Sequence, residues 1–206
     1  MKYNLYVEDV SVEAVFDKLG GVDGARRFLR NEPIVFEPAR SWHEKNGVIY
    51  FSITSDGTTG EDWIGRLEKL GFRLSSYAKS VLRSSDFKLT NGVTYEMAVL
   101  KGELFSDENR ITSKIRAEAN KRKLSKPNAE VACLIREKFT DKEIESMGLW
   151  WVIAMHEPIK DSDGYPFLLG ASRDDDGQWL FTDWGGLDFG WFRDDGFAFV
   201  VSQVSA

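Results

Sequence analysis

An uninterrupted apolar segment at residues 149–155, with the sequence LWWVIAM, constrains the fold more than any other stretch of the chain. Its seven residues are too few to cross a bilayer, which takes about 20 in a helix. A bounded run of this length that contains Trp, Val and Ile is typical of a strand covered on both faces. His156, Glu157 and Pro158 follow at once, and Pro has no N–H to donate to a neighbouring strand. The segment therefore predicts a central strand that ends near Met155.

The composition is that of an ordinary globular protein. The 206 residues, 42% apolar and 29% charged, suffice for one substantial core or two small ones. The net charge of −6 argues against a surface built entirely for nucleic acid, although a local basic face is compatible with it. The only cysteine, Cys133, excludes an internal disulfide and a cysteine-based zinc cluster. No apolar leader follows Met1, so we expect a cytoplasmic protein without a membrane partner.

Periodic patterns predict an α+β protein in which helices pack on a mainly antiparallel sheet. Strands are expected at 3–7, 34–36, 48–53, 93–100 and 149–155, and helices at 11–19, 23–30, 63–70, 76–83, 107–124, 127–139 and 140–148. Asp-Gly pairs at 163–164 and 176–177 separate apolar segments, which predicts a C-terminal β-meander. A last strand at 196–201 is expected to pair deep in the sheet.

The link at 101–107 is the expected boundary between two lobes. Residues 1–104 would form an N-terminal α+β lobe, and residues 105–206 a C-terminal lobe with a helical segment followed by the β-meander. One continuous domain is the alternative, because the link is short and not especially flexible in composition.

The first candidate site is His156 at the exit of the central strand. An imidazole near carboxylates can act as a general base or a hydrolytic metal ligand. His156 and Glu157 would point to opposite faces of a strand, so Asp161 or Asp163 is the expected partner. These residues would centre a hydrolase-type enzyme.

The second candidate is a cation loop from Ser172 to Asp183. Oxygen-bearing side chains that include Asp174, Asp176 and Asp183 follow a degenerate EF-hand spacing, with Gly177 at its sixth position. An acidic hairpin turn explains the same residues. No cofactor is predicted apart from Ca²⁺ in this one loop.

The third candidate is an aromatic platform. Trp179, Trp184 and Trp191 are interleaved with acids that include Asp183 and Asp188. Such a composition resembles surfaces on which sugar rings stack while carboxylates accept the hydroxyls, and Trp-rich patches also supply affinity for partner proteins. The alternative is that these rings pack between the sheet and the helices.

The most basic stretch lies at 110–126. Lys114, Lys121, Arg122 and Lys123 lie on or directly after a predicted helix with a narrow apolar stripe. Three helices in succession could present a face resembling a helix-turn-helix arrangement, which would bind nucleic acid. A solvated surface helix has the same pattern, so nucleic acid is not the favoured partner.

Residues 127–139, 155–164, 196–201 and 52–63 together resemble a group of uncharacterised bacterial proteins of unknown function. The resemblance covers most of the chain and implies no activity and no site residues. From the residues themselves we favour a non-enzymatic binding or interaction protein that uses the aromatic and acidic C-terminal loops, with a protein or a glycan as ligand. The hydrolase and the nucleic-acid binder are the alternatives.

Overall fold

The computed structural model describes residues 15–16, 19, 21–32, 40–161, 163–174 and 176–201. The chain divides into two units, residues 1–41 and 42–206. In the first unit, α2 (Gly21–Leu29) confirms the predicted helix at 23–30. The predicted strands at 3–7 and 34–36, and most of the predicted helix at 11–19, lie outside the described residues.

In the second unit, the described residues form a ten-stranded sheet in the order β1-β2-β4-β10-β6-β8-β9-β3, with β5 beside β10 and β7 beside β8. Its strands are β1 (His43–Lys45), β2 (Val48–Asp56), β3 (Arg73–Leu74), β4 (Asn91–Lys101), β5 (Leu124–Ser125), β6 (Trp151–Ala154), β7 (Ile159–Lys160), β8 (Pro166–Asp174), β9 (Gly177–Trp184) and β10 (Asp195–Val201). The pairs β6–β10 and β3–β9 are parallel and the other pairs are antiparallel. The fold is therefore α+β, as the sequence predicts.

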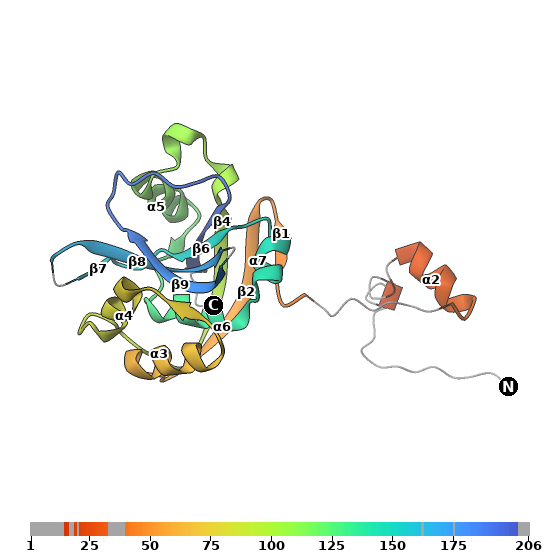
Figure 1. Ribbon diagram of the computed structural model, residues 1–206. Coiled ribbons are helices and arrows are strands. Elements are labelled where there is room, and N and C mark those ends of the chain that lie inside the picture. Colours follow the sequence, from red (N-terminus) through yellow and green to blue (C-terminus); the bar gives the residue numbers. More distant parts are fainter. Residues whose placement is uncertain are drawn as a thin grey trace. The chain divides into compact units, whose positions relative to one another are not determined.

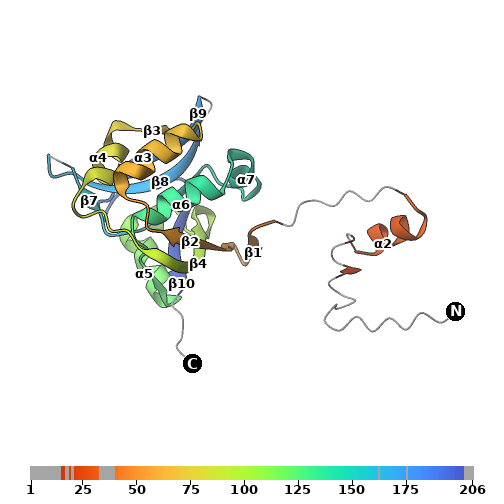
Figure 2. The same cartoon turned by 90° about the horizontal axis from the view of Figure 1, so that it is seen from below.

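Helices cover both faces of this sheet, as Figures 1 and 2 show. The helices are α3 (Gly60–Lys69), α4 (Ser76–Arg83), α5 (Thr112–Lys121), α6 (Glu130–Lys138) and α7 (Asp141–Ser146), with short 3-10 turns η1 (Gly102–Leu104) and η2 (Asp107–Asn109). One face, which we call the helical face, packs against α3, α4, α6 and α7. The other, which we call the α5 face, is covered by α5 and by parts of the segments at 102–111 and 185–194.

Each face has its own buried core. On the helical face, Trp63 and Leu67 of α3 and Ile135 of α6 pack among apolar strand residues. On the α5 face, Ile115 of α5 belongs to the cluster that contains Phe197 of β10. Because α5 spans only 10 residues, about 15 Å at 1.5 Å per residue, it cannot cover the whole of this face.

Local signals in the sequence position several of these elements. Asn46 and Gly47 have φ values of 53° and 72°, the left-handed geometry that a two-residue hairpin turn between β1 and β2 requires. The Thr59 side chain caps α3, and Thr140 with Glu143 forms a capping box at the start of α7, within the helix predicted at 140–148. The helix predicted at 76–83 coincides with α4.

The apolar segment at 149–155 provides β6, an inner strand between β10 and β8, as predicted. β10 does lie deep in the sheet, between β4 and β6. The expected lobe boundary at 104 falls within the second unit, whose sheet takes strands from both sides of that position. Within the described residues, every helix is too short or too polar to span a bilayer.

Candidate functional site

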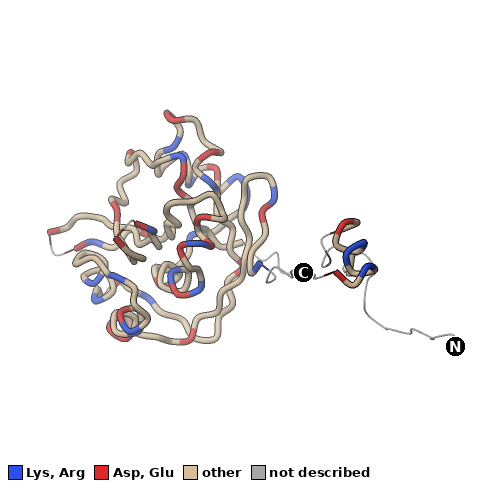
Figure 3. The backbone as a smooth tube through the Cα atoms, turned by 45° about the vertical axis from the view of Figure 1, so that its right-hand side comes forward, with Lys and Arg blue, Asp and Glu red and all other residues tan. Residues whose placement is uncertain are grey.

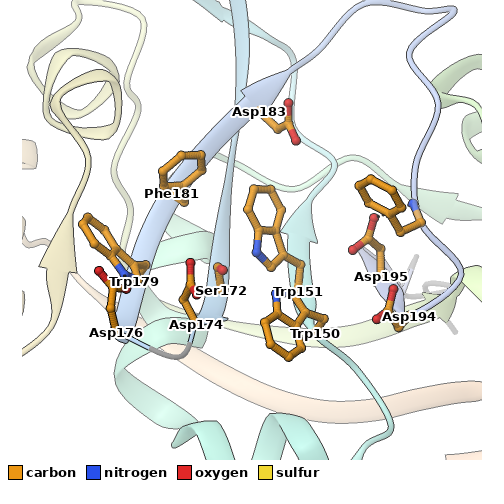
Figure 4. A pocket seen from close by; sticks show the side chains of 11 residues that line it. Trp150, Trp151, Ser172, Asp174, Asp176, Trp179, Phe181, Asp183, Asp194 and Asp195 are labelled. Carbon is orange, nitrogen blue, oxygen red and sulfur yellow. Dashed lines mark hydrogen bonds between the residues drawn. The ribbon is translucent and has the colours of Figure 1, made fainter.

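A pocket of about 570 Å³ opens on the α5 face, over β6, β8 and β9 and beside the start of β10 (Figure 4). Its lining combines aromatic rings, carboxylates and one hydroxyl. The residues are Trp150, Trp151, Ser172, Asp174, Asp176, Trp179, Phe181, Asp183, Phe192, Asp194 and Asp195. The lining contains no lysine, arginine or histidine.

Strand register explains the shape of the pocket. Trp151 of β6 lies opposite Ser172 of β8, and Ser172 lies opposite Trp179 of β9. Residues opposite one another in register point to the same face of a sheet. Because neighbouring strands are about 4.8 Å apart, the two indoles stand on strands about 9–10 Å apart, with only the small Ser172 between them. The result is a trough with aromatic walls, which Figure 4 shows from close by.

A second row, one pleat further along the same face, closes one end of the trough. Here Gly170 of β8 lies opposite Ile153 of β6 and Phe181 of β9. Gly170 carries no side chain, so β8 contributes little bulk in either row. The Phe181 ring contacts the rings on both walls. Its centroid lies 5.4 Å from that of Trp151, with an interplanar angle of 54°, and 6.2 Å from that of Trp179, at 85°.

Two arginines pack on indoles at the margins of the pocket. The Arg73 guanidinium carbon lies 5.4 Å from the centroid of the Trp179 ring, and Arg73 also pairs with Asp176 at 2.7 Å. The Trp179 indole donates to the other oxygen of Asp176 at 2.9 Å. The Arg173 guanidinium carbon lies 4.7 Å from the ring centroid of Trp150. Trp179 and Trp150 therefore each make a cation–π contact within the protein.

The carboxylates at the start of β10 and the end of β9 are partly desolvated. Asp195 is 3% exposed, and its Oδ2 accepts a hydrogen bond from the Phe192 N–H at 2.8 Å. Burial, with smaller contributions from Asp194 and Asp183, raises the pKa of Asp195 to about 7, although that hydrogen bond and Arg110 lower it. Burial also raises the pKa of Asp183, whose Oδ1 accepts from the Trp184 N–H. At Asp183 and Asp195, burial therefore outweighs the interactions that favour an ionised carboxylate, whereas the exposed Asp176 is paired with Arg73.

The structure places two residues of the predicted aromatic platform in this pocket. Trp179 and Asp183 line the pocket. Trp184 is 39% exposed but lies outside the lining, where it packs against Tyr165 at a centroid distance of 5.7 Å. Asp188 is exposed in the segment after β9 and also lies outside the lining.

The expectation that Trp191 presents a ring to a ligand is wrong. Trp191 is only 6% exposed, and its indole N–H donates to the Thr112 hydroxyl at 3.0 Å. The bond to Thr112 and the isolated bridge between Ile111 and Gly190 hold it at the start of α5, and an edge-on contact with Phe197 packs it on β10. Trp191 thus anchors the segment at 185–194 on the α5 face.

Several lining residues are missing from the sequence-based candidates. Trp150 and Trp151 were assigned to the core, yet Trp150 is exposed and Trp151 half-buried. Phe181 could have been found from the sequence, because Trp179, Phe181 and Asp183 alternate along one strand and therefore point to the same face of the sheet. No local signal shows that Trp151 and Asp195 join them, because that depends on strand order.

His156 lies in the interior of the fold. It is 2% exposed, its Nδ1 lies 2.6 Å from the Glu157 carbonyl oxygen, and its Nε2 accepts from the Leu169 N–H at 3.0 Å. Burial lowers the pKa of His156 to about 4. Both nitrogens are engaged by backbone groups, so the ring has no free nitrogen for a substrate. The expected acids form a separate turn, in which Asp161 Oδ1 accepts from the N–H of Asp163 at 3.0 Å.

The acids proposed for Ca²⁺ lie at two ends of one strand. Asp174 and Asp176 flank the β8–β9 hairpin, and Asp183 lies near the other end of β9, opposite Leu168. The strand from Gly177 to Asp183 spans about 20 Å at 3.3 Å per residue, whereas Ca²⁺ ligands lie within about 2.6 Å of the ion. Within the described residues, no group of three or more His, Cys, Asp or Glu could hold a metal ion.

The basic residues at 110–126 lie on α5 or directly after it. Those proposed to contact nucleic acid are all exposed: Lys114, Lys121, Arg122 and Lys123. Glu118 pairs with two of them, Lys121 at 3.6 Å and Arg122 at 2.8 Å, and Figure 3 shows acidic and basic positions interspersed along the backbone. α5 and α6 lie on opposite faces of the sheet, so the successive helices form no helix-turn-helix arrangement.

Comparisons with protein-family models, curated proteins and solved structures gave no match. The resemblance to a bacterial group stays an expectation from the sequence.

Proposed function

We propose that the protein is a non-enzymatic binding protein whose ligand occupies the trough between Trp151 and Trp179. One observation supports the proposal above all. The α5 face of the sheet is covered by α5 and the neighbouring segments, except at the trough, where aromatic side chains border an open pocket. A volume of about 570 Å³ lies within the range of small-ligand sites. Rings held on neighbouring strands are fixed in place before a ligand arrives, which lowers the entropic cost of binding.

The polar groups of the pocket favour binding over catalysis. The lining has no histidine, cysteine or lysine. Its one hydroxyl, that of Ser172, donates to the Arg173 carbonyl oxygen at 3.4 Å, and the lining offers no histidine to activate it as a nucleophile. The hydrolase alternative loses support because His156 lies in the interior with both ring nitrogens engaged. The nucleic-acid alternative rests on the exposed basic side chains at 110–126, two of which already pair with Glu118.

The proposal is tested with a panel of small organic compounds that includes neutral disaccharides, short peptides and alkylammonium salts. Binding is followed by isothermal titration calorimetry on the full chain. We expect at least one class to bind, and binding to be lost when Trp151 and Trp179 are both replaced by Ala.

Trp184→Ala is the matched control, because Trp184 is also a partly exposed indole of β9 but lies outside the pocket. It should bind like the unaltered chain. Binding that survives the Trp151→Ala, Trp179→Ala double variant, with the fold intact by circular dichroism, would contradict the proposal.

A further inference from the structure

The chemistry of the trough also indicates its ligand class, an inference that rests on the proposed function. We infer that the trough takes an organic cation, whose alkylated ammonium group sits above Ser172, between Trp151 and Trp179 and against Phe181. The ligand would be a quaternary or methylated amine, free or at the end of a longer chain.

The first argument is charge. The lining contributes five aspartates and no cationic side chain. Arg73 and Arg173 at the margins are each engaged by a carboxylate, Asp176 and Glu145 respectively. Asp174, Asp176 and Asp194 are exposed, whereas Asp195 is buried and Asp183 partly buried. The burial of these two carboxyl groups is costly, and a cation bound in the pocket would offset that cost. A neutral sugar would leave that cost in place.

The second argument is the arrangement of the rings. A sugar stacks its flat face on one ring or on rings that lie nearly parallel. Here Phe181 is inclined by 54° to Trp151 and by 85° to Trp179, so the three rings bound a concave space. Rings at large angles around one point are how proteins bind quaternary ammonium groups, because each ring presents electron density to the cation.

The third argument is the width of the trough. Its walls stand on strands about 9–10 Å apart, and a carbon atom packs on a ring at about 3.5–4 Å. A trimethylammonium group, only a few ångströms across, can therefore contact both walls at once. Ser172 makes this possible, because a larger side chain on β8 would occupy the same space.

The carboxyl of Asp195 gives the inference a pH dependence. Burial raises its pKa to about 7. The groups that act on this carboxyl are the Phe192 N–H, the carboxylates of Asp194 and Asp183, and the Arg110 guanidinium. By register, Asp195 lies beside Trp151 on the side away from Ser172, so its charge acts on the trough from behind that indole. A cation binds more tightly when this carboxyl is ionised, so affinity should rise between pH 6 and pH 8.

The test compares two probes of the same shape. Choline carries a trimethylammonium group, and 3,3-dimethylbutan-1-ol replaces that charged nitrogen by carbon. Calorimetric titrations at matched ionic strength should show choline binding at least about tenfold more tightly, the size that a desolvated cation–π contact implies. Trp151→Ala and Asp195→Asn should each weaken choline binding, whereas Trp184→Ala should leave it unchanged.

Equal or tighter binding of the neutral alcohol would overturn the inference and leave the proposed binding function standing. Binding of a neutral disaccharide without choline would have the same meaning. Failure of choline to bind the folded chain at all would also overturn the inference. The proposed binding function would then be tested separately by the panel of neutral disaccharides, peptides and alkylammonium salts. If Trp151→Ala does not fold, Trp151→Leu, which keeps an apolar side chain but no ring, replaces it and should also lose choline binding.

Discussion

Trp151 and Trp179 face each other across Ser172, each in register with that serine on the strand between them. The two indoles are 28 positions apart in the sequence, yet they form the two walls of one trough. Their placement follows from strand pairing, and it is the basis of the predictions below.

Replacing Ser172 by Leu should fill the floor of the trough. We expect ligand binding to fall by more than about tenfold, because the new side chain would occupy the space between the two indoles. Ser172→Ala is the matched control and should bind normally, since it removes the hydroxyl but keeps the trough open. Calorimetry on both variants makes the comparison. Equal binding by the Leu and Ala variants would show that the ligand sits elsewhere.

Replacing Asp195 by Asn should alter how stability depends on pH. Between about pH 4 and pH 7, the folded state keeps a proton on Asp195 that the unfolded state has released, because burial raises its pKa from 3.8 to about 7. The free energy of unfolding contributed by this group therefore falls as pH rises through that window.

The Asn variant does not titrate there, so it should gain stability relative to the unaltered chain, by up to about 4 kcal/mol at pH 8 and by little at pH 4. Urea unfolding of both chains across this range measures the difference. A difference that stays constant with pH would show that the Asp195 pKa is not raised.

His156→Ala should reduce stability and leave ligand binding unchanged. The substitution leaves the Leu169 N–H buried without its acceptor, which costs about 1–3 kcal/mol. Urea unfolding gives that cost, and calorimetry with the unaltered chain's ligand gives the affinity. Loss of a hydrolytic activity in a variant that still folds would instead support the enzyme alternative.

The same histidine makes the unaltered chain sensitive to acid. Because burial lowers the pKa of His156 from 6.5 to about 4, the unfolded state binds a proton in this window that the folded state does not. Its contribution to stability is therefore present above pH 6.5 and is lost as pH falls toward 4. The comparison of Asp195→Asn with the unaltered chain is free of this effect, because both chains keep His156.

Replacing Trp191 or Trp184 by Ala should lower the free energy of unfolding by very different amounts. Trp191→Ala removes a buried ring and its bond to Thr112, which should cost about 3–5 kcal/mol. Trp184→Ala removes a partly exposed ring and should cost less than about 1 kcal/mol. Thermal unfolding of both variants provides the measurement. Similar losses would mean that the segment at 185–194 is not anchored through Trp191.

Local patterns were enough to predict many of the elements. The apolar segment at 149–155 indicates β6, the helical pattern at 76–83 indicates α4, and the apolar segment at 196–201 indicates β10. Each of these signals depends on a few neighbouring residues, so the sequence contains all the information needed.

The site itself could be predicted only in part. The interleaving of tryptophans with acids in the C-terminal part of the sequence makes Trp179 and Asp183 candidates, and both lie on β9. Trp151 and Asp195 join them because β10 enters the sheet beside β6 in parallel, a pairing between segments far apart in sequence. In the sequence, Trp191 and Trp179 both lie among aspartates and glycines, so local composition does not distinguish them. Only the fold shows that Trp191 is buried, in contact with Thr112 and Phe197.

The most direct test follows the indole N–H signals of the seven tryptophans by ¹H–¹⁵N NMR, assigned through single Trp→Phe variants, while choline or the probe that binds in its place is added. The account predicts that the signals of Trp151 and Trp179 shift with saturation, whereas those of buried Trp63 and Trp191 stay fixed. Saturable binding that leaves the signals of Trp151 and Trp179 unmoved would contradict it.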